Sequence, residues 1–435
     1  MYKLGIDIGT TTICAVVVDN KNCVMETVNT ESNAFIESSD SFERIQDVTV
    51  IENKAIAIVN DLLAKYDVTH IGVTGQMHGI LYTDINGKAV SPLYTWQDGR
   101  GDELCGDMSY AQKLACISGY RLATGYGTVT HFYNMENGLV PNDAVFFLTI
   151  HDYIAMKLAG NNFPVMHASD AASLGIFDIE KCEFDLAAAK RAGISPSFFP
   201  KVVRNISPLG KLKNATVFTA IGDNQASFLG SVSDSENSIL INVGTGSQIS
   251  VAVNGETALS AQSVSGIDVR PLNGDKFILV GASLCGGRAY QILEGFFRDV
   301  LKMAGCDDKR LYDAMDKLSE QYDTLTEKLD FSTLFAGTRE NPALRGTVSG
   351  ISTSNFTATH FVVGVLEGTV NELYDTYEKI LPLLESVPTK LIASGNGIRK
   401  SHVTREMFAS RFHMTLEMPL NKEEAAFGAA ISTKN

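Results

Sequence analysis

The strongest constraint on the fold is a short pattern that occurs twice in the sequence. Residues 6–12 read IDIGTTT and residues 241–247 read INVGTGS, and each predicts a strand, a Gly-Thr turn and a second strand. Glycine lets the backbone approach a ligand closely, and successive N–H groups in such a turn form an anion-binding concavity. Two β-hairpins in a long chain also match by chance, which leaves an internal duplication open. The pair nevertheless favours a nucleotide held between two related domains, with one turn on either side of its phosphates.

The segments that follow the two hairpins correspond as well. In the first half, a helix at 52–66 has its apolar residues on one face and precedes a buried strand at 71–73 and a polar loop at 74–79. In the second half, a helix at 361–386 is followed by a strand and a glycine turn within 391–397. A strand that leads into a loop rich in glycine and hydrogen-bonding groups is where α/β proteins bind ligands.

Two α/β domains are therefore expected. The polar stretch at 232–237 separates them, which gives domains at 1–234 and 235–435. Near the end of the first domain, residues 216–221 predict a strand that leads into Gly222–Gln225 (GDNQ) and then a helix.

Composition narrows the class of protein. The chain of 435 residues carries a formal net charge of −14, with 45% hydrophobic and 20% charged residues, as in folded globular proteins. A pI near 5.1 argues against nucleic acid as a partner, which needs a basic surface. No run approaches 18 apolar residues, and we expect neither a membrane span nor a signal peptide. The seven cysteines include no CxxC pair, which argues against disulfides or zinc and favours the reducing cytoplasm.

Glycine turns follow predicted strands at 9–12, 244–247 and 394–397. None is a Walker A loop or a GxGxxG fingerprint after the first strand, and a glycine turn after a strand is often only a turn. Asp7 lies two residues before the first of them. A carboxylate there is suited to hold Mg²⁺ through water, because Mg²⁺ gives up its water reluctantly. The alternative is an aspartate that is hydrogen-bonded to nearby backbone donors.

Four motifs occur in one order along the chain. They are Asp7-x-Gly9-Thr10, GQMHG at 75–79, WQDGR at 96–100 and GDNQ at 222–225. Together they resemble the FGGY carbohydrate kinases, and the resemblance covers nearly the whole chain. It implies an α/β fold class in which two actin-like ATPase (ribonuclease H-like) domains flank a catalytic cleft.

Further runs indicate which part of that family is most similar. The loop at 75–79 is typical of its xylulokinase side. The runs at 95–100, 124–127 (TGYG) and 169–173 (SDAAS) most resemble the sedoheptulokinases. Both groups phosphorylate a ketose, so the resemblance implies a ketose as the acceptor.

By this resemblance, Asp223 is the general base that takes the proton from the attacking sugar hydroxyl, and Asp7 and Asp223 hold Mg²⁺ beside ATP. The residues support the place of Asp223, because a carboxylate at a helix N-terminus is kept ionised by the helix dipole. Such a base is weak, yet phosphoryl transfer depends more on positioning than on basicity. The alternative is an aspartate that only caps the helix.

The resemblance also implies a sugar site that supplies many hydrogen-bond donors and acceptors for a polyol. Its residues are Gln76, Met77, His78, Trp96, Asp98, Arg100, Tyr126, Asn224 and Gln225. His131 is a further candidate to close the pocket. Two alternatives stay open. Trp96, the only tryptophan, is equally consistent with a core residue, and Arg100 is also consistent with an ion pair to Asp98 on the same loop.

A nucleotide site follows from the same resemblance. Most of it would lie in the domain at 235–435, whereas the sugar site and the catalytic aspartate would lie in the domain at 1–234. Its phosphate-binding residues are Gly9, Thr10, Thr11, Thr12, Gly244, Thr245 and Gly246, and its adenine–ribose residues are Gly395, Asn396 and Arg399. The chain departs from the family at 394–400 (SGNGIRK), where many relatives have a run of glycines followed by alanine. Residues 281–288 resemble the start of a helix beside the ATP cleft, with a simple turn as the alternative.

We therefore expect an ATP- and Mg²⁺-dependent carbohydrate kinase that transfers the γ-phosphoryl group to the terminal hydroxyl of a ketose, sedoheptulose first and D-xylulose second. Its partners would be the sugar and ATP, with no nucleic acid and no membrane, and a homodimer is left open. One alternative is an actin-like ATPase or ATP-gated regulator that acts on a protein partner. The glycine turns fit such a protein equally well, but its activity does not require the motifs at 76–79, 96–100 and 223–225. A sugar-binding pseudokinase is disfavoured by Asp7 and Asp223.

Overall fold

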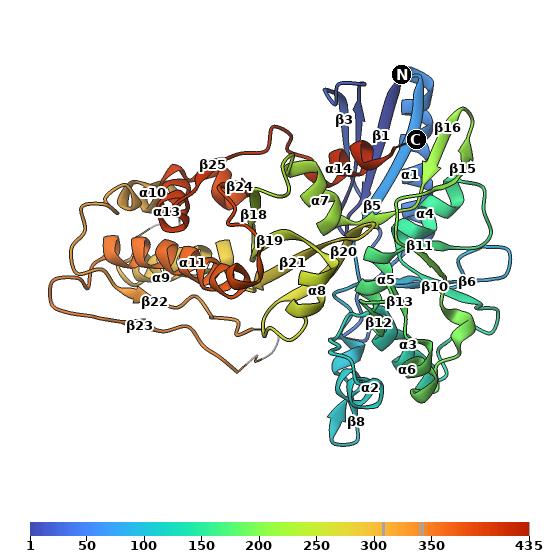
Figure 1. Ribbon diagram of the computed structural model, residues 1–435. Helices are drawn as coiled ribbons and strands as arrows, with labels where there is room; N and C mark the ends of the chain where they lie inside the picture. Colours follow the sequence, from blue (N-terminus) through green and yellow to red (C-terminus); the bar gives the residue numbers. More distant parts are fainter. Residues whose placement is uncertain (307–308, 339–340, 342, 435) are drawn as a thin grey trace. The chain divides into compact units, whose positions relative to one another are not determined.

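The first glycine turn joins two central strands of the larger sheet in the computed structural model of the chain (Figure 1). β1 (Tyr2–Ile8) and β2 (Thr12–Val18) form the predicted antiparallel hairpin. β1 also pairs in parallel with β5 (Val68–Gly75), which contains the strand expected at 71–73. The structure describes residues 1–434 except 307–308, 339–340 and 342.

The chain divides into two compact units. The N-terminal unit comprises Met1–Ser231, Arg270–Phe277 and Asn421–Asn435, and the C-terminal unit comprises Val232–Val269 and Ile278–Leu420. The N-terminal unit thus collects three separate parts of the chain. A domain boundary between residues 234 and 235 stays a prediction.

The sheet of the N-terminal unit has seven strands in the order β15-β16-β5-β1-β2-β3, with β17 also paired to β5. The predicted strand at 216–221 is interrupted, because β16 ends at Phe218 and β17 (Ile221–Gly222) pairs separately with the end of β5. The other long strands are β3 (Val24–Glu31), β15 (Pro208–Leu212) and β16 (Ala215–Phe218). Short strand pairs are β4 (Ile45–Gln46) with β7 (Leu93–Tyr94), β6 (Leu81–Thr83) with β10 (Phe146–Leu148), β11 (Val165–His167) with β14 (Lys201–Val203), β12 (Phe177–Asp178) with β13 (Glu183–Phe184), and β8 (Leu104–Cys105) with β9 (Met108–Ser109).

One face of this sheet packs against α1 and α4. Leu4, Ile6 and Ile8 of β1 point to this face and share one core with apolar residues of both helices. α1 starts before the predicted residue 52 because the Asp47 carboxylate caps it and accepts the first free N–H groups. The helices of the unit are α1 (Val48–Lys65), α2 (Tyr110–Ser118), α3 (Gly127–Glu136), α4 (Ile150–Leu158), α5 (Ala168–Leu174), α6 (Leu186–Arg191), α7 (Asp223–Ser231) and α14 (Glu424–Ser432).

The opposite face of the sheet is covered by α14, which lies unusually close to it. A Cβ atom at Gly5 of β1 would overlap the carbonyl of Ala426, and one at Gly72 of β5 would overlap the carbonyl of Ala429. α14 approaches α7 in the same way, since a Cβ atom at Gly428 would overlap the carbonyl of Ala226. The backbone of α14 therefore rests directly on glycines, and no side chain fits between them.

The C-terminal unit repeats the arrangement of the first hairpin. β18 (Ser238–Val243) pairs antiparallel with β19 (Ser247–Asn254) and parallel with β24 (Lys390–Ser394), as β1 pairs with β2 and β5. The sheet has six strands in the order β20-β21-β19-β18-β24-β25, of which residues 270–277 of β20 and β21 are counted with the N-terminal unit. The remaining strands are β20 (Asp268–Asn273), β21 (Lys276–Ser283) and β25 (Thr415–Glu417), with β22 (Asp330–Phe331) and β23 (Val348–Ser349) paired apart.

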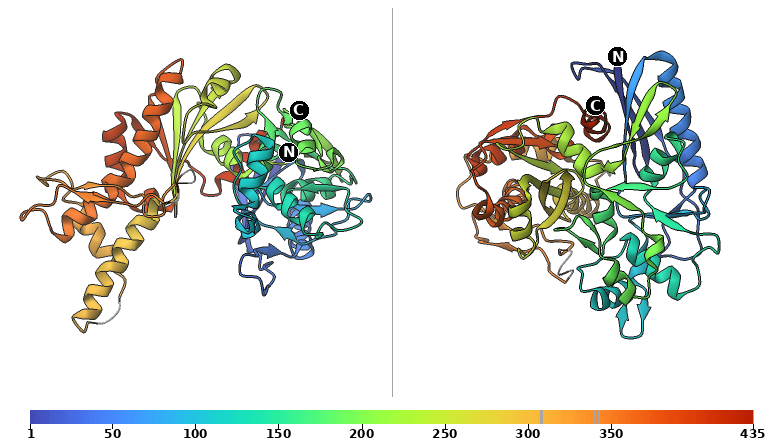
Figure 2. Two further views of the ribbon diagram at one scale, coloured as in Figure 1. Left: turned by 90° about the horizontal axis from the view of Figure 1, so that it is seen from below. Right: turned by 45° about the vertical axis from the view of Figure 1, so that its right-hand side comes forward.

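α11 (Ala358–Ile380) packs along this sheet and supplies much of the core of the C-terminal unit (Figure 2). It ends before the predicted residue 386, where a short 3₁₀ turn containing a proline follows at 381–383. The other helices are α8 (Gly255–Ala261), α9 (Gly286–Met303), α10 (Tyr312–Ser319), α12 (Asn396–Lys400) and α13 (His402–Phe412). In the part of the chain that the structure describes, no helix is long and apolar enough to cross a membrane.

The contact of α14 with the sheet predicts an asymmetric effect of two alanine substitutions. Gly72→Ala forces a methyl group into a backbone carbonyl and should lower the free energy of unfolding by about 3 kcal/mol. Gly295→Ala, in the interior of α9 with open space around it, should raise that free energy by about 0.5–1 kcal/mol. Calorimetric unfolding of both variants checks the pair. Equal effects would contradict the packing described here.

Two buried histidines predict how stability depends on pH. Burial lowers the pKa of His131 and of His167 from 6.5 to about 4. Between these values each histidine takes up a proton in the unfolded chain but not in the folded chain, so its own contribution to stability falls by up to about 3 kcal/mol as the pH drops from about 6.5 to about 4. The loss of free energy of unfolding that the histidines cause between pH 6.5 and pH 4 should be smaller in His131→Leu than in the unmodified protein. An unchanged slope would contradict the assignment.

Candidate functional site

Three strands place the site of the N-terminal unit at one edge of its sheet. β1, β5 and β17 run parallel, so their carboxyl ends meet there. Asp7 of β1 is aligned with Thr74 of β5, and Gly222 of β17 is aligned with Gly75. α7 begins at the next residue, Asp223. Asp7 and Asp223 therefore flank β5 at the same edge.

Both carboxyl groups lie in surroundings that disfavour charge. Burial, followed by the negative charges of Asp223 and Glu423, raises the pKa of Asp7 to about 7. Burial also raises the pKa of Asp223, against the opposite effects of His151, the Asn224 backbone N–H and Arg270. A helix dipole alone predicts a weak base at Asp223, but burial outweighs it and makes this carboxylate a stronger proton acceptor.

One oxygen of this pair is suited to a cation. Oδ1 of Asp7 is buried and has no hydrogen-bond partner among the residues that the structure describes, and an orphaned anionic oxygen is stabilised by a metal ion or by one of its waters. Oxygen donors are also the ligands that Mg²⁺ prefers. The residues present thus fit the ion, and Asp7 and Asp223 stay its predicted ligands.

The loop after β5 brings several predicted sugar residues together. His78 adopts a left-handed conformation with φ of 72°, and its ring stacks on Tyr126 with centroids 4.7 Å apart. Its Nδ1 lies 2.7 Å from the carbonyl oxygen of Ser173. Because a carbonyl only accepts, Nδ1 carries the proton and Nε2 of the neutral ring is an acceptor. The backbone of Gly125 packs against the carbonyl of Trp96, which holds the 124–127 turn beside the same loop.

Trp96 is not a core residue, because 46% of it is exposed. Its indole N–H donates to the hydroxyl of Thr10 over 3.1 Å, and that hydroxyl donates to Oε1 of Gln76, also over 3.1 Å. One hydrogen-bonded chain therefore joins a predicted phosphate residue to two predicted sugar residues. The neighbouring Thr11 and Thr12 are exposed, as is required of residues that meet a ligand.

Asp98 and Arg100 form the ion pair that the sequence left as an alternative. Nε of Arg100 lies 2.6 Å from Asp98, and its other nitrogens donate to Asn134 and Glu43. The guanidinium also lies 4.1 Å above the ring of Tyr94. Both partners are buried, so their visible role is to hold the 95–102 loop, and a direct contact with sugar stays a prediction.

Met77, Asn224 and Gln225 also gather at this edge. Gly222 has no side chain, and Met77 and Gln225 occupy the space beside it. Gln225 is buried and donates to the carbonyl of Pro271 over 3.1 Å, while Asn224 accepts from Arg270. The structure thus brings these three predicted residues to Asp223, Met77 beside Gly222 and the other two through contacts with the segment at 270–277.

His131 is not beside the site. Only 1% of it is exposed, it bonds to the hydroxyl of Tyr82, and aromatic rings including Phe147 and Phe198 surround it. The expectation that it closes a pocket is wrong, because it lies on the buried side of α3. Its helix neighbours Gly127, Thr128 and Asn134 are also buried, but because they are small or polar, hydrophobic periodicity could not have revealed this burial.

A buried cluster near Asp223 was missed by the sequence analysis. Nε2 of His151 lies 3.1 Å from Asp170, and Thr149 donates to Asp152 over 2.7 Å. Burial raises the pKa values of Asp152 and Asp170 well above their usual range, so a proton shared between them is favoured. Asp170 falls in the SDAAS run, which supported the resemblance without a role for the aspartate.

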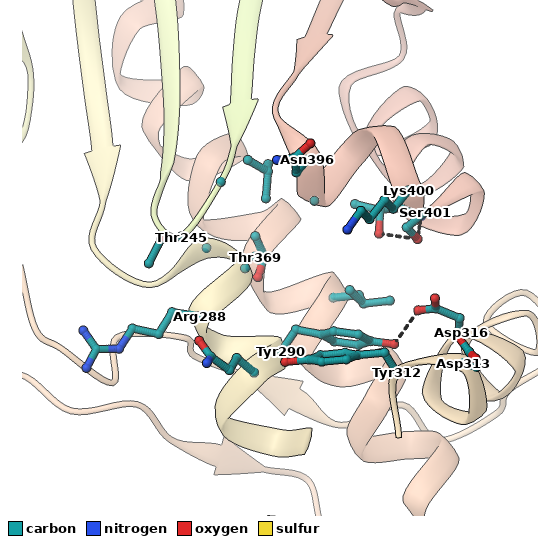
Figure 3. A pocket seen from close by; sticks show the side chains of 18 residues that line it. Thr245, Arg288, Tyr290, Tyr312, Asp313, Asp316, Thr369, Asn396, Lys400 and Ser401 are labelled. Carbon is teal, nitrogen blue, oxygen red and sulfur yellow. Dashed lines mark hydrogen bonds between the residues drawn. The ribbon is translucent and has the colours of Figure 1, made fainter. Parts of the chain in front are cut away.

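The C-terminal unit contains a cavity of about 610 Å³ that is large enough for a nucleotide (Figure 3). Three predicted nucleotide residues line it, namely Gly244, Thr245 and Asn396. α9 begins at its wall with Gly286, which confirms the helix start suggested at 281–288. In its first turn the N–H groups of Gly287 and Arg288 donate to the carbonyls of Gly244 and Thr245, which ties the helix start to the second glycine turn. The dipole of this long helix still favours an anion at its N-terminus.

Two other predicted nucleotide residues do not line the cavity but pack against residues that do. Gly395 has φ of 91° and packs against the carbonyl of Val243, and Gly246 packs against Gly286. Neither is among the residues that line the cavity, and Lys400 lines it where Arg399 was expected. Both glycines permit a close backbone approach, which keeps the walls of the cavity together.

An aromatic pair in the cavity was not anticipated from the sequence. The rings of Tyr290 and Tyr312 stack with centroids 6.1 Å apart, and the Tyr290 hydroxyl donates to Asp316 over 2.9 Å (Figure 3). The two tyrosines come from α9 and α10 and offer a flat surface for a base. Residues 309–328 read as a charged, solvated segment, so nothing in their composition pointed to a binding role for Tyr312.

Two family models together match nearly the whole chain. The family model for the N-terminal domain of the FGGY family of carbohydrate kinases matches residues 2–240, and that for the C-terminal domain matches residues 239–433. The chain is 27% identical to sedoheptulokinase from Mus musculus over 98% of this chain and 96% of that one, and 23% identical to gluconokinase from Bacillus subtilis over 99% and 86%.

Solved structures show the same fold. The xylulose kinase from Rhodospirillum rubrum superimposes with a TM-score of 0.83 at 21% identity, over 99% of this chain and 89% of that one. The two units therefore have the two-domain actin-like ATPase fold that the sequence predicts. With both family models matched in order, the chain belongs to the FGGY family of carbohydrate kinases.

Proposed function

We propose that this kinase transfers the γ-phosphoryl group of ATP to the terminal hydroxyl of a ketose, with sedoheptulose favoured over D-xylulose. The observation that carries the proposal is the meeting of three runs at His78. It bonds to Ser173 of the 169–173 run and stacks on Tyr126 of the 124–127 run, which packs on Trp96. These are the runs whose resemblance favours a sedoheptulokinase-like site, and the mouse sedoheptulokinase is among the most similar relatives.

Asp223 is the proposed general base. Its carboxylate takes the proton of the attacking hydroxyl as the bond between that oxygen and the γ-phosphorus forms and the bond to ADP breaks. Burial, which raises its pKa, favours proton uptake. His78 accepts a hydrogen bond from another sugar hydroxyl through Nε2, and the exposed face of Trp96 contacts sugar C–H groups.

The nucleotide is proposed to occupy the cavity of the C-terminal unit. Gly244, Thr245 and the first turn of α9 would bind its phosphates, and Tyr290 and Tyr312 its base. Mg²⁺, held by Asp7 and Asp223, would supply positive charge against the phosphate oxygens. Family membership supports the use of ATP.

Asp223→Ala should lower kcat by at least about 100-fold while the fold stays intact. ADP release is measured with Mg-ATP against sedoheptulose, D-xylulose, ribulose, fructose and glycerol. One sugar that gives high turnover and a product heavier by one phosphate identifies the acceptor. Asp299→Ala, at a surface site on α9, serves as the matched control and should leave kcat unchanged. Near-normal turnover of Asp223→Ala contradicts the assigned base, and ADP release that is indifferent to every sugar favours an actin-like ATPase.

Tyr312→Ala should weaken Mg-ATP binding by about tenfold, because a stacking surface for the base is lost. A bound nucleotide stabilises the folded state by mass action, so thermal unfolding at increasing Mg-ATP reports the affinity. Tyr322→Ala removes a tyrosine of the same unit outside this cavity and should bind as the unmodified protein does. Equal affinity of the two variants would place the nucleotide elsewhere.

A further inference from the structure

A closed ring of hydrogen bonds lies beneath the first glycine turn. Nε2 of Gln46 donates to the backbone carbonyl of Thr10 over 2.7 Å. Nε2 of Gln76 donates to Oε1 of Gln46 over 2.9 Å. The Thr10 hydroxyl donates to Oε1 of Gln76 over 3.1 Å and closes the ring. Gln46 was not a candidate in the sequence analysis, because a single glutamine in a two-residue strand carries no signal.

The direction of every hydrogen bond in the ring follows from the bond between Gln46 and the Thr10 carbonyl. A backbone carbonyl only accepts, so the amide nitrogen of Gln46 must face Thr10 and its oxygen must face Gln76. This sets the amide of Gln76, whose oxygen then faces the Thr10 hydroxyl. The hydroxyl gives its only proton to Gln76 and can accept the indole N–H of Trp96, which it does over 3.1 Å. The ring therefore admits one orientation of both amides.

Burial separates the roles of the ring members. Gln46 is fully buried and Gln76 is 3% exposed, whereas Trp96 is 46% exposed. Thr10 belongs to the glycine turn assigned to phosphate, and Gln76 and Trp96 belong to the loops assigned to sugar. Gln46 bonds to Thr10 of the phosphate turn and to Gln76 of the sugar loop. Because it is fully buried, it contacts neither the nucleotide nor the sugar directly.

We propose that Gln46 is a positioning residue that couples the sugar loops to the phosphate turn, an inference that rests on the proposed function. A phosphate oxygen that accepts the hydrogen bond of the Thr10 hydroxyl must take it from Gln76, because the hydroxyl has only one proton. The ring then opens and Oε1 of Gln76 loses its donor. Trp96 can still donate to the Thr10 oxygen, but the ring no longer fixes the position of that oxygen, so a ligand at the turn changes the sugar site. Coupling between two binding sites is reciprocal, and sugar therefore changes nucleotide affinity by the same factor.

The chain offers a matched control for this proposal. The hydroxyl of Ser32 donates to the same carbonyl oxygen of Thr10 over 2.9 Å, and Ser32 is buried like Gln46. Ser32→Ala and Gln46→Leu each remove one hydrogen bond to that oxygen, but only Gln46→Leu opens the ring. Gln46→Glu is the conservative partner, because its carboxylate can still accept from Gln76 but cannot donate to Thr10.

The single tryptophan makes the measurement direct, since all tryptophan emission comes from Trp96. We titrate the emission with Mg-ADP alone, and then with sedoheptulose and with D-xylulose in the absence and presence of saturating Mg-ADP. In the unmodified protein and in Ser32→Ala, Mg-ADP should change the emission and should change sugar affinity by about fivefold or more. In Gln46→Leu and Gln46→Glu, that factor should fall to within about twofold of unity.

The outcomes are distinct. A purely structural role for Gln46 would lower the unfolding temperature of Gln46→Leu and Ser32→Ala alike and leave the coupling factor unchanged, which overturns the proposal. An unmodified protein whose Trp96 emission ignores bound Mg-ADP also overturns it. If no sugar is phosphorylated, the proposed function fails instead, and the Mg-ADP titration, which needs no sugar, still decides the inference: a response that Gln46→Leu loses and Ser32→Ala keeps supports it.

Discussion

The parallel pairing of β5 with β1 and β17 is the constraint on which the rest of the site depends. β5 ends in Gly75 between the ends of its two neighbours, so whatever follows the three strands must share one small region. Asp7 precedes one end, Gln76 follows another and Asp223 the third. Chemistry that needs several groups at one point is thus supplied by backbone hydrogen bonding alone, before any side chain has packed.

The pairing also concentrates negative charge. Asp7 and Asp223 lie where Asp152 and Asp170 are buried close by, and burial raises the pKa of all four carboxyl groups. Holding so many carboxyl groups out of water opposes folding unless protons, cations or hydrogen bonds compensate. The clustered carboxyl groups therefore favour a bound cation and lower the stability of the folded chain. Such a cost to stability is common at functional sites.

Sequence patterns predicted the parts of the fold that depend on local periodicity. Both glycine hairpins, α1 and α11 lie where alternation or helical spacing indicated, with ends moved by Asp47 and by the proline turn at 381–383. Motif matches pointed to loops that the structure brings together, but they could not distinguish an exposed side chain from a buried one that supports the loop. Arg100 is an example, because a buried ion pair depends on Glu43 and Asn134, which are far away in sequence. The roles of Gln46 and Tyr312 could not be predicted from the sequence for the same reason, because tertiary packing determines their partners.

The glycine contacts of α14 have a consequence for how the chain is made. The N-terminal unit needs residues 421–434 to cover one face of β1 and β5, yet the whole C-terminal unit is encoded between them. During synthesis, that face of the first 231 residues stays uncovered until nearly 200 more residues have been translated and α14 can pack on it. The C-terminal unit is effectively an insertion that can fold while its host is incomplete. Chaperone demand should therefore fall on the first half of the nascent chain, and on its open sheet in particular.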